Sequence, residues 1–179
     1  MPGLDETRPF IPVGIAVLTV SDTRTLADDR SGDTLAARIK EAGHRLVDRA
    51  IVPDDRQAIA SRVKAWTERD DIDVVITTGG TGFTGRDVTP EALEPLFEKR
   101  MDGFSEVFHR ISYDKIGTST IQSRATAGVA NAWLQAVSLR QPGWWRWLGL
   151  AVVLEALALA ILYVALSGDP GARPAAPSP

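Results

Sequence analysis

The sequence contains no cysteine and only two histidines, His44 and His109. The absence of cysteine excludes disulfides, thiolate nucleophiles and zinc sites built from thiolates. The two histidines lie far apart in the chain and do not have the spacing of metal ligands, so we expect both to be ordinary side chains. The sequence therefore argues against cysteine-based and histidine-based metal sites.

A basic excess is also absent, because 20 Lys and Arg stand against 23 Asp and Glu, for a formal net charge of -3. A nucleic-acid surface needs a basic excess or a basic stripe, so we expect no nucleic-acid partner. The first six residues are acidic and polar rather than basic and then apolar. We therefore expect no secretory signal peptide and a cytoplasmic location.

Apolar runs that are typical of strands alternate with helical patterns in the first half of the chain. Strands are predicted at residues 13–20, 45–52 and 74–78, and helices at residues 31–41 and 56–68. This alternation predicts the α/β class, with a mainly parallel sheet between two layers of helices. In such sheets ligands bind beyond the carboxyl ends of the strands, which here carry Ser21 and Asp22, Asp54, and the segment 79–87.

The third predicted strand leads into a glycine-rich loop, TTGGTG at residues 77–82. Glycines permit positive φ angles and let backbone N–H groups approach an anion, so the loop is a candidate phosphate cradle. Thr89 is predicted as a helix N-cap and Pro90 as the first helical residue, which would place the positive end of a helix dipole nearby. Asp87, an acid beside a predicted anion site, indicates a metal ion or a catalytic role. The glycines alone leave an ordinary strand-to-helix turn equally open.

Two further segments follow the glycine loop. Residues 102–113 place Phe104, Val107, Phe108 and Ile111 at helical spacing, which predicts an amphipathic helix in the core or at a subunit interface. Residues 118–128 are rich in hydroxyl groups and contain Arg124. They form either a binding loop for an anionic ligand or a solvated surface loop.

Six motifs together resemble the MoaB/MogA family of molybdenum cofactor biosynthesis proteins. They are LTVSDTR (18–24), DRSGD (29–33), VPDD (52–55), TTGGTG (77–82), RDVTPEA (86–92) and STIQSRATAG (119–128). The resemblance covers residues 13–131, and the stretch 116–128 is most similar to the MoaB branch.

The resemblance implies a three-layer α/β/α domain that forms trimers or hexamers and binds molybdopterin. Active members transfer an adenylyl group from ATP to molybdopterin with the help of magnesium. Asp54 and Asp87 match the two acids on which the family's adenylyltransferases depend, and would hold or orient Mg²⁺. A non-catalytic molybdopterin-binding or scaffold protein of the same pathway is the alternative. The other residues predicted to bind substrates are Ser21, Asp22, Asp29, Ser31, Gly32, Thr78, Gly79, Gly80, Thr81, Gly82, Arg86, Ser123 and Arg124.

The family pattern stops after residue 131, before the last strand, proline-containing loop and helix of the resembled proteins. Residues 1–12 are predicted as an N-terminal tail. Residues 132–146 are predicted as a linker and residues 167–179 as a disordered tail. Residues 147–166 are apolar apart from Glu155, which predicts an apolar helix close to the ~20 residues that span a bilayer. This segment either tethers a cytoplasmic domain to the inner membrane or results from a frame shift or fusion. The absence of lysine after Lys115 favours the second explanation.

Overall fold

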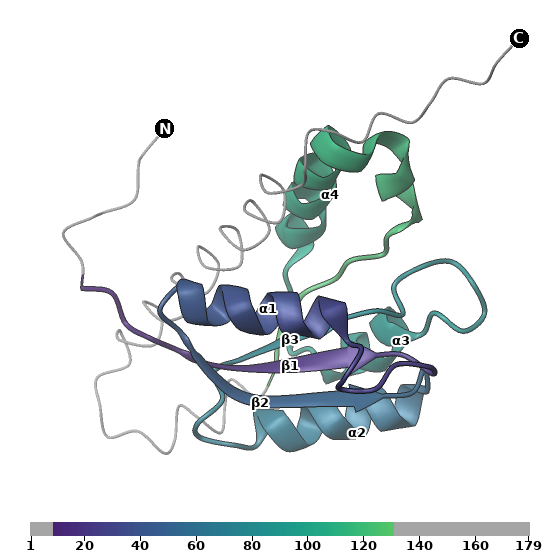
Figure 1. Cartoon of the computed structure of the whole chain (residues 1–179). Coiled ribbons are helices and arrows are strands. Elements are labelled where there is room, and N and C mark those ends of the chain that lie inside the picture. The colour runs from purple at the N-terminus through teal and green to yellow at the C-terminus, as the bar shows by residue number, and fades with distance from the viewer. Residues whose placement is uncertain (1–8, 131–179) are drawn as a thin grey trace, which may run out of the picture.

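The structure, a computed structural model, describes residues 9–130 (Figure 1). The predictions for most of the N-terminal tail, for the linker at 132–146, for the apolar helix at 147–166 and for the tail at 167–179 lie outside the described residues. Between residues 9 and 130, no helix has the length and apolar character needed to cross a membrane.

Three parallel strands form the main sheet, in the order β2-β1-β3. They are β1 (Gly14–Val20), β2 (Arg45–Val52) and β3 (Val74–Thr78), which confirms the three predicted strands. Every residue of the central strand β1 is buried. A strand covered on both faces needs no polar side, and this explains why its sequence is a continuous apolar run.

Helices cover both faces of this sheet, with α1 (Arg30–Glu41) on one face and α2 (Arg56–Thr67) on the other (Figure 1). Alternate side chains of β1 point to opposite faces. Val17 packs with Ile39 of α1, whereas Leu18 packs with Ile59 and Trp66 of α2. The prediction of an α/β domain with a parallel sheet between helical layers is confirmed for the described residues.

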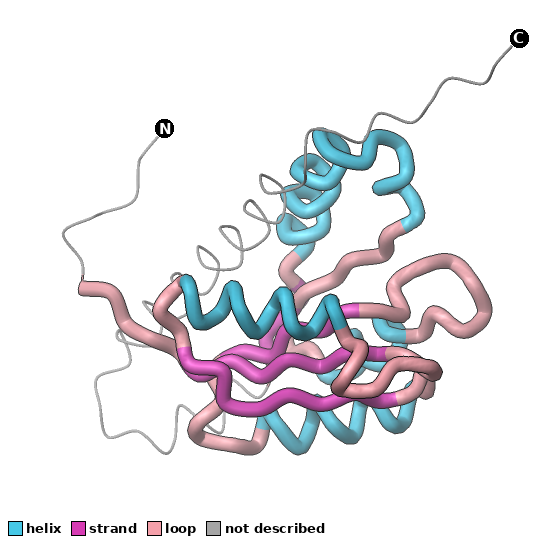
Figure 2. Tube along the Cα trace, in the orientation of Figure 1, coloured by secondary structure: helices cyan, strands magenta, loops and turns pink. Residues whose placement is uncertain are grey.

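The order of the strands determines where a ligand can bind. The chain leaves β1 for β2 on one side, then crosses over to β3 on the other side of β1. The loops that follow the strands lie along one edge of the sheet (Figure 2). A crevice opens beyond the carboxyl ends of adjacent strands where the strand order reverses. The loops after β1 and β3 flank this point.

The second half of the described chain contains shorter elements beside the sheet. They are α3 (Thr89–Leu93), a 3₁₀ helix η1 (Glu94–Leu96), β4 (Lys99–Arg100), α4 (Asp102–Ile116), a second 3₁₀ helix η2 (Gly117–Gln122) and β5 (Gly128–Val129). Strands β4 and β5 pair antiparallel. The segment predicted as a loop at 118–128 is therefore a 3₁₀ helix at its start and a short strand at its end.

Helix α4 carries the predicted amphipathic stripe, but none of its residues is buried. Val107 in the middle of the stripe is 50% exposed. Helix α4 stands away from the three-stranded sheet and packs against η2 (Figure 1). The stripe is thus not part of the core formed by residues 9–130, and the interpretation as a subunit interface is the one left open.

Two helices begin at other residues than predicted, and a side-chain hydrogen bond explains each difference. Helix α1 begins at Arg30 rather than Ser31, because the Asp29 carboxylate accepts a hydrogen bond from Gly32 N at 2.9 Å and caps the helix. Thr89 is not an N-cap. It is the first residue of α3, it is 1% exposed, and its hydroxyl donates instead to Gly79 O at 2.9 Å.

Candidate functional site

The structure brings the two predicted catalytic acids against the glycine loop. Asp54 follows β2, and Asp87 lies between the loop and α3. A Cβ atom built on Gly80 would lie 2.9 Å from Asp54 Oδ1, and one built on Gly82 would lie 2.8 Å from Asp87 Oδ2. Gly80 has φ +63°, a value that favours glycine. The loop therefore requires small residues where it meets the acids.

Asp22 connects the ends of the strands around this loop. Its Oδ1 accepts a hydrogen bond from Asp54 N at 3.2 Å, and its Oδ2 forms an ion pair with Arg86. Burial, and then the negative charges of Asp22 and Asp87, raise the pKa of Asp54, while the charge of Arg86 acts in the opposite direction. A cation bound beside Asp54 would relieve this repulsion.

Asp87 has a different electrostatic environment. Its Oδ2 accepts hydrogen bonds from the Thr84 hydroxyl and from Thr84 N, the latter at 2.9 Å. These bonds lower the pKa of Asp87. One acid of the pair is therefore held ionised and oriented by the loop, whereas the other lies in an environment that disfavours its charge.

Thr89 and Arg124 together bind four consecutive carbonyl groups of the glycine loop. Thr89 donates through its hydroxyl to Gly79 O at 2.9 Å and through its backbone N–H to Gly80 O at 3.0 Å. Arg124 donates through its backbone N–H to Thr81 O at 2.9 Å and through Nε to Gly82 O at 2.8 Å. The loop carbonyls thus bond to the protein. Among the described residues, no acceptor is recorded for the N–H groups of Gly80 and Thr81, which suit an anion.

The Arg124 guanidinium makes two further hydrogen bonds in the same region. Its Nη2 donates to Asp87 O at 2.6 Å, and its Nη1 pairs with Glu91 of α3. The bond from Arg124 lowers the pKa of Glu91. The guanidinium also lies over the ring of Phe83, 5.8 Å from its centroid. Arg124 therefore links the segment after η2 to the end of the glycine loop, to Asp87 and to α3.

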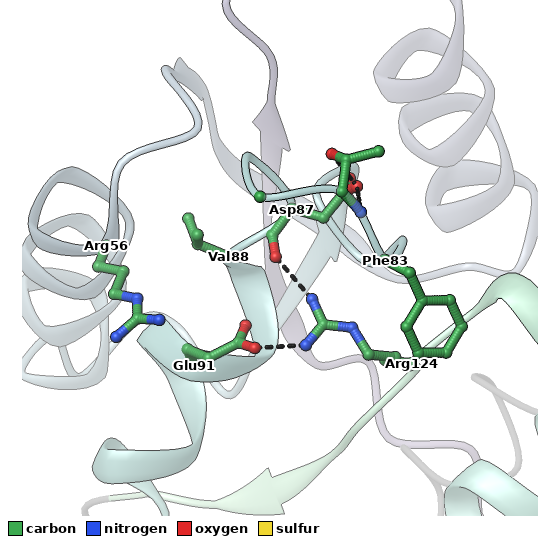
Figure 3. Close-up of a pocket in the computed structure, with 8 residues that line it drawn as sticks. Arg56, Phe83, Asp87, Val88, Glu91 and Arg124 are labelled. Carbon is green, nitrogen blue, oxygen red and sulfur yellow. Dashed lines mark hydrogen bonds and ion pairs between the residues drawn. The ribbon is translucent and has the colours of Figure 1, made fainter.

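A pocket of about 220 Å³ opens beside these residues (Figure 3). Six of its residues are not among the predicted site residues, namely Arg56, Phe83, Thr84, Gly85, Val88 and Glu91. Arg56 is the first residue of α2, which follows the short turn after β2 ends at Val52, so the strand-end rule could have identified it. The pocket is lined by Arg56, Phe83, Thr84, Gly85, Asp87, Val88, Glu91 and Arg124.

The acids of the site suit a magnesium ion that binds together with a phosphate ligand. In the described part of the chain, no group of three or more acidic or histidine residues forms a metal cluster. Magnesium usually keeps several waters and is held by one or two carboxylates together with substrate phosphates. Asp54 and Asp87, which contact the candidate phosphate loop at Gly80 and Gly82, suit this kind of site better than a closed metal cage.

Three predicted binding residues belong instead to the start of α1. Asp29 is 0% exposed and receives hydrogen bonds from the Thr19 hydroxyl at 2.6 Å and from Arg49 Nη2 at 2.8 Å. Burial alone would raise the pKa of Asp29, but these bonds outweigh it and the pKa is lowered. Gly32 is buried against Asp29 and Arg49, and Ser31 is exposed in the first helical turn. This group connects α1 to the sheet, and no recorded bond joins it to the glycine loop.

The remaining predicted residues lie at the ends of neighbouring elements. Thr78 is the last residue of β3. The Ser21 hydroxyl accepts a hydrogen bond from Arg24 N at 3.3 Å. Ser123 O lies 2.8 Å from His109 Nε2, which donates to it, and Ser123 N donates to Thr120 O. His44 is buried, with Nδ1 accepting from Val13 N, and burial lowers its pKa.

Comparisons with known proteins agree on one family. A family model described as "Probable molybdopterin binding domain" matches residues 16–140, nine residues beyond the end of the sequence resemblance. Molybdenum cofactor biosynthesis protein B of Escherichia coli (strain K12) is 56% identical over 122 residues, which cover 68% of this chain and 72% of that protein.

Solved structures give the same result. A crystal structure of molybdenum cofactor biosynthesis protein B has a TM-score of 0.66 at 44% identity, covering 69% of this chain and 77% of that one. The "tungsten cofactor synthesizing protein MoaB" of Pyrococcus furiosus has a TM-score of 0.56 at 37% identity, covering 68% and 76%. The chain therefore belongs to the molybdopterin-binding domain family that includes molybdenum cofactor biosynthesis protein B.

Proposed function

We propose that this chain acts in molybdenum cofactor biosynthesis, where it binds molybdopterin and transfers the adenylyl group of ATP to it. The observation that carries this proposal is the meeting of Asp54 and Asp87 at a glycine loop whose carbonyls are bonded to Thr89 and Arg124. Membership of a molybdopterin-binding family supports molybdopterin as the ligand. The match of the two acids to the family's adenylyltransferases supports ATP as the second substrate.

In the proposed reaction, a phosphate oxygen of molybdopterin attacks the α-phosphorus of ATP. A new P–O bond forms while the bond from the α-phosphorus to the bridging oxygen of the β-phosphate breaks. The electron pair of that bond leaves with pyrophosphate. This attack brings several negative charges together, so the protein contributes by positioning the phosphates and by stabilising their charge. The N–H groups of Gly80 and Thr81 are the backbone donors suited to that task.

Bound magnesium would supply positive charge next to the phosphate oxygens. Asp54 and Asp87 are the residues that would hold it. Asp87 is already ionised and fixed by Thr84, and Asp54 lies where burial and two other acids disfavour its charge. A cation between them would therefore stabilise the ionised form of Asp54 most strongly.

A non-catalytic molybdopterin-binding or scaffold protein is the second candidate. The sequence lacks the family's proline-containing ending after residue 131, and this loop helps to close the site in the resembled proteins. A binder would take up molybdopterin without consuming nucleotide. The dependence of the reaction on ATP therefore separates the two functions.

The test is an adenylylation assay on the full-length chain in mild detergent, with Mg-ATP and molybdopterin, in which pyrophosphate release is followed. Asp54→Asn and Asp87→Asn are each expected to lower turnover about 100-fold, because each removes a charge from the phosphate site. Asp55→Asn is the matched control. Asp55 caps α2 by accepting a hydrogen bond from Ala58 N at 2.8 Å, and asparagine caps equally well.

Two outcomes would contradict the proposal that this chain is an adenylyltransferase. If the wild-type chain binds molybdopterin but releases no pyrophosphate, the scaffold function replaces it. If both asparagine variants keep activity close to that of Asp55→Asn, the two acids do not carry the chemistry.

We also propose that the chain forms trimers or hexamers through α4. Val107, Tyr113 and Ile116 are exposed, at 50%, 56% and 57%, and the other residues of the stripe, Phe104, Phe108 and Ile111, are only half-buried. An exposed apolar helix face on a soluble domain commonly marks a protein interface. Light scattering on the purified chain checks this, and the mass of a single chain would refute it.

A further inference from the structure

We propose that the two guanidinium groups of the pocket have separate roles. Arg56 binds the anionic group of the ligand, and Arg124 is a positioning residue that holds the glycine loop. This inference rests on the proposed function and names the cation that contacts the polyphosphate of ATP or the released pyrophosphate. It reverses the expectation from the sequence, in which Arg124 contacts the substrate.

All three guanidinium nitrogens of Arg124 are bonded to the protein. Each of its three guanidinium nitrogens donates a hydrogen bond, to Gly82 O, to Asp87 O and to Glu91. Its backbone N–H bonds to Thr81 O as well. A guanidinium has five N–H donors in a rigid plane, so the three bonds fix its orientation. Arg124 could turn toward a ligand only by releasing the loop carbonyls that it holds.

Arg56 lines the same pocket but is exposed. No hydrogen bond or ion pair of Arg56 is recorded with any residue between 9 and 130. Figure 3 shows its guanidinium on the opposite side of Glu91 from Arg124, with no dashed line to a neighbour. Glu91 Oε2, which is buried, also has no hydrogen-bond partner in the described part of the chain, and the charge of Arg56 acts on Glu91 through space.

The charges of the pocket leave Arg56 as its available cation. The charge of Arg124 is paired with Glu91, and Asp87 is the acid expected to hold magnesium. A phosphate group that enters the pocket therefore meets, at Arg56, a positive charge that forms no ion pair with any residue between 9 and 130. Arginine binds phosphate through two parallel hydrogen bonds, which gives both affinity and orientation. Phe83, which is 68% exposed, forms the wall beside Arg124 at the other side of the pocket.

The experiment measures the binding of Mg-ATP and of magnesium pyrophosphate to the full-length chain by calorimetry at low and high salt, together with turnover. Arg56→Ala is expected to raise the Kd about tenfold, because it removes one charge-assisted contact, and to weaken the salt dependence. Arg56→Lys is expected to recover part of the affinity. Arg62→Gln is the charge control, because Arg62 lies on the same helix and does not line the pocket.

Arg124→Lys tests the positioning role, since lysine keeps the charge but cannot make the three guanidinium bonds. It is expected to change the Kd less than about threefold and to lower kcat about 100-fold, because the loop is no longer held in the reactive geometry. Arg124→Gln, which retains one donor group, serves as a second variant. Thermal melts identify any variant that fails to fold.

The opposite pattern would overturn the inference. If Arg124→Lys loses affinity as strongly as Arg56→Ala is expected to, Arg124 is the ligand-binding cation. If the wild type binds Mg-ATP and Arg56→Ala binds it equally well, the role of Arg56 is wrong while the proposed function stands. If the wild type binds neither Mg-ATP nor pyrophosphate, both the inference and the proposed adenylyl transfer are rejected.

Discussion

Arg49→Met tests whether Asp29 is a structural residue or a substrate contact. Asp29 is 0% exposed, and the side chain of its partner Arg49 is 18% exposed. After the substitution, the Asp29 carboxylate keeps the bonds from Thr19 and Gly32 but loses its opposite charge. Breaking a buried ion pair by removing one partner costs about 3–5 kcal/mol. The lower end applies here because two hydrogen bonds remain, so we expect a loss of about 3 kcal/mol, or roughly 10 °C in Tm.

The pH dependence of this loss follows from the pKa of Asp29. In the wild type, burial would raise the pKa, but the bonds from Thr19 and Arg49 outweigh it, and the pKa is lowered. A lowered native pKa contributes stability above the ordinary value of about 4, which is lost as the pH falls through the native value. Without Arg49, the hydrogen bond and the charge of the guanidinium no longer lower the pKa of Asp29, so its native pKa lies higher than in the wild type. The variant is therefore most destabilised near neutral pH, and its deficit shrinks below about pH 4.

The measurement is urea unfolding followed by circular dichroism, at fixed protein concentration and across this pH range. Arg69→Met is the control, because Arg69 pairs with Asp48 and Asp71 at the surface, where its side chain is 41% exposed. Such a pair contributes about 0–1 kcal/mol. The reasoning is refuted if Arg49→Met loses no more stability than this control, or if its deficit does not shrink in acid. If the Arg49→Met protein folds but binds Mg-ATP more weakly, Asp29 contributes to the binding site after all.

Two further predictions concern the loop and its acids. Gly80→Ala is expected to lower Mg-ATP affinity at least about tenfold, because its Cβ would lie 2.3 Å from Thr89 Oγ1 at a backbone φ of +63°. Calorimetry measures this affinity, and a value within twofold of the wild type would contradict the prediction. Asp22→Asn removes a charge that raises the pKa of Asp54, so the acid limb of the rate profile is expected to move to lower pH, and a shift to higher pH would be the contrary result.

The sheet and its helices could be predicted because their signals are local. The apolar run of β1 and the helical spacing of Ile59, Val63 and Trp66 each reflect burial of a single element against its neighbours. The positions of Asp22 and Asp54 followed from one general rule about the carboxyl ends of parallel strands. These predictions needed no knowledge of which side chains meet.

The individual roles of the polar residues could not be predicted, because each depends on a partner far away in the sequence. Thr89 precedes a proline and resembles an N-cap, yet its hydroxyl bonds to Gly79 once α3 lies against the loop. Asp29 falls within a family motif, yet its partner is Arg49, 20 residues away. Arginine beside many hydroxyls suits an anion equally well, whether or not its guanidinium is already occupied.

The geometry of the glycine loop depends on contacts from α4. Arg124, which holds two of the four bonded carbonyls, is placed by hydrogen bonds from Ser105 and His109 of α4 to the segment around it. Helix α4 has no buried residue, so local opening there costs little free energy. Such an opening would release Thr81 O and Gly82 O while the sheet stayed intact. A protein surface that packs on α4 would therefore stabilise the loop through Arg124. Such packing would couple the shape of the candidate phosphate site to a surface outside it.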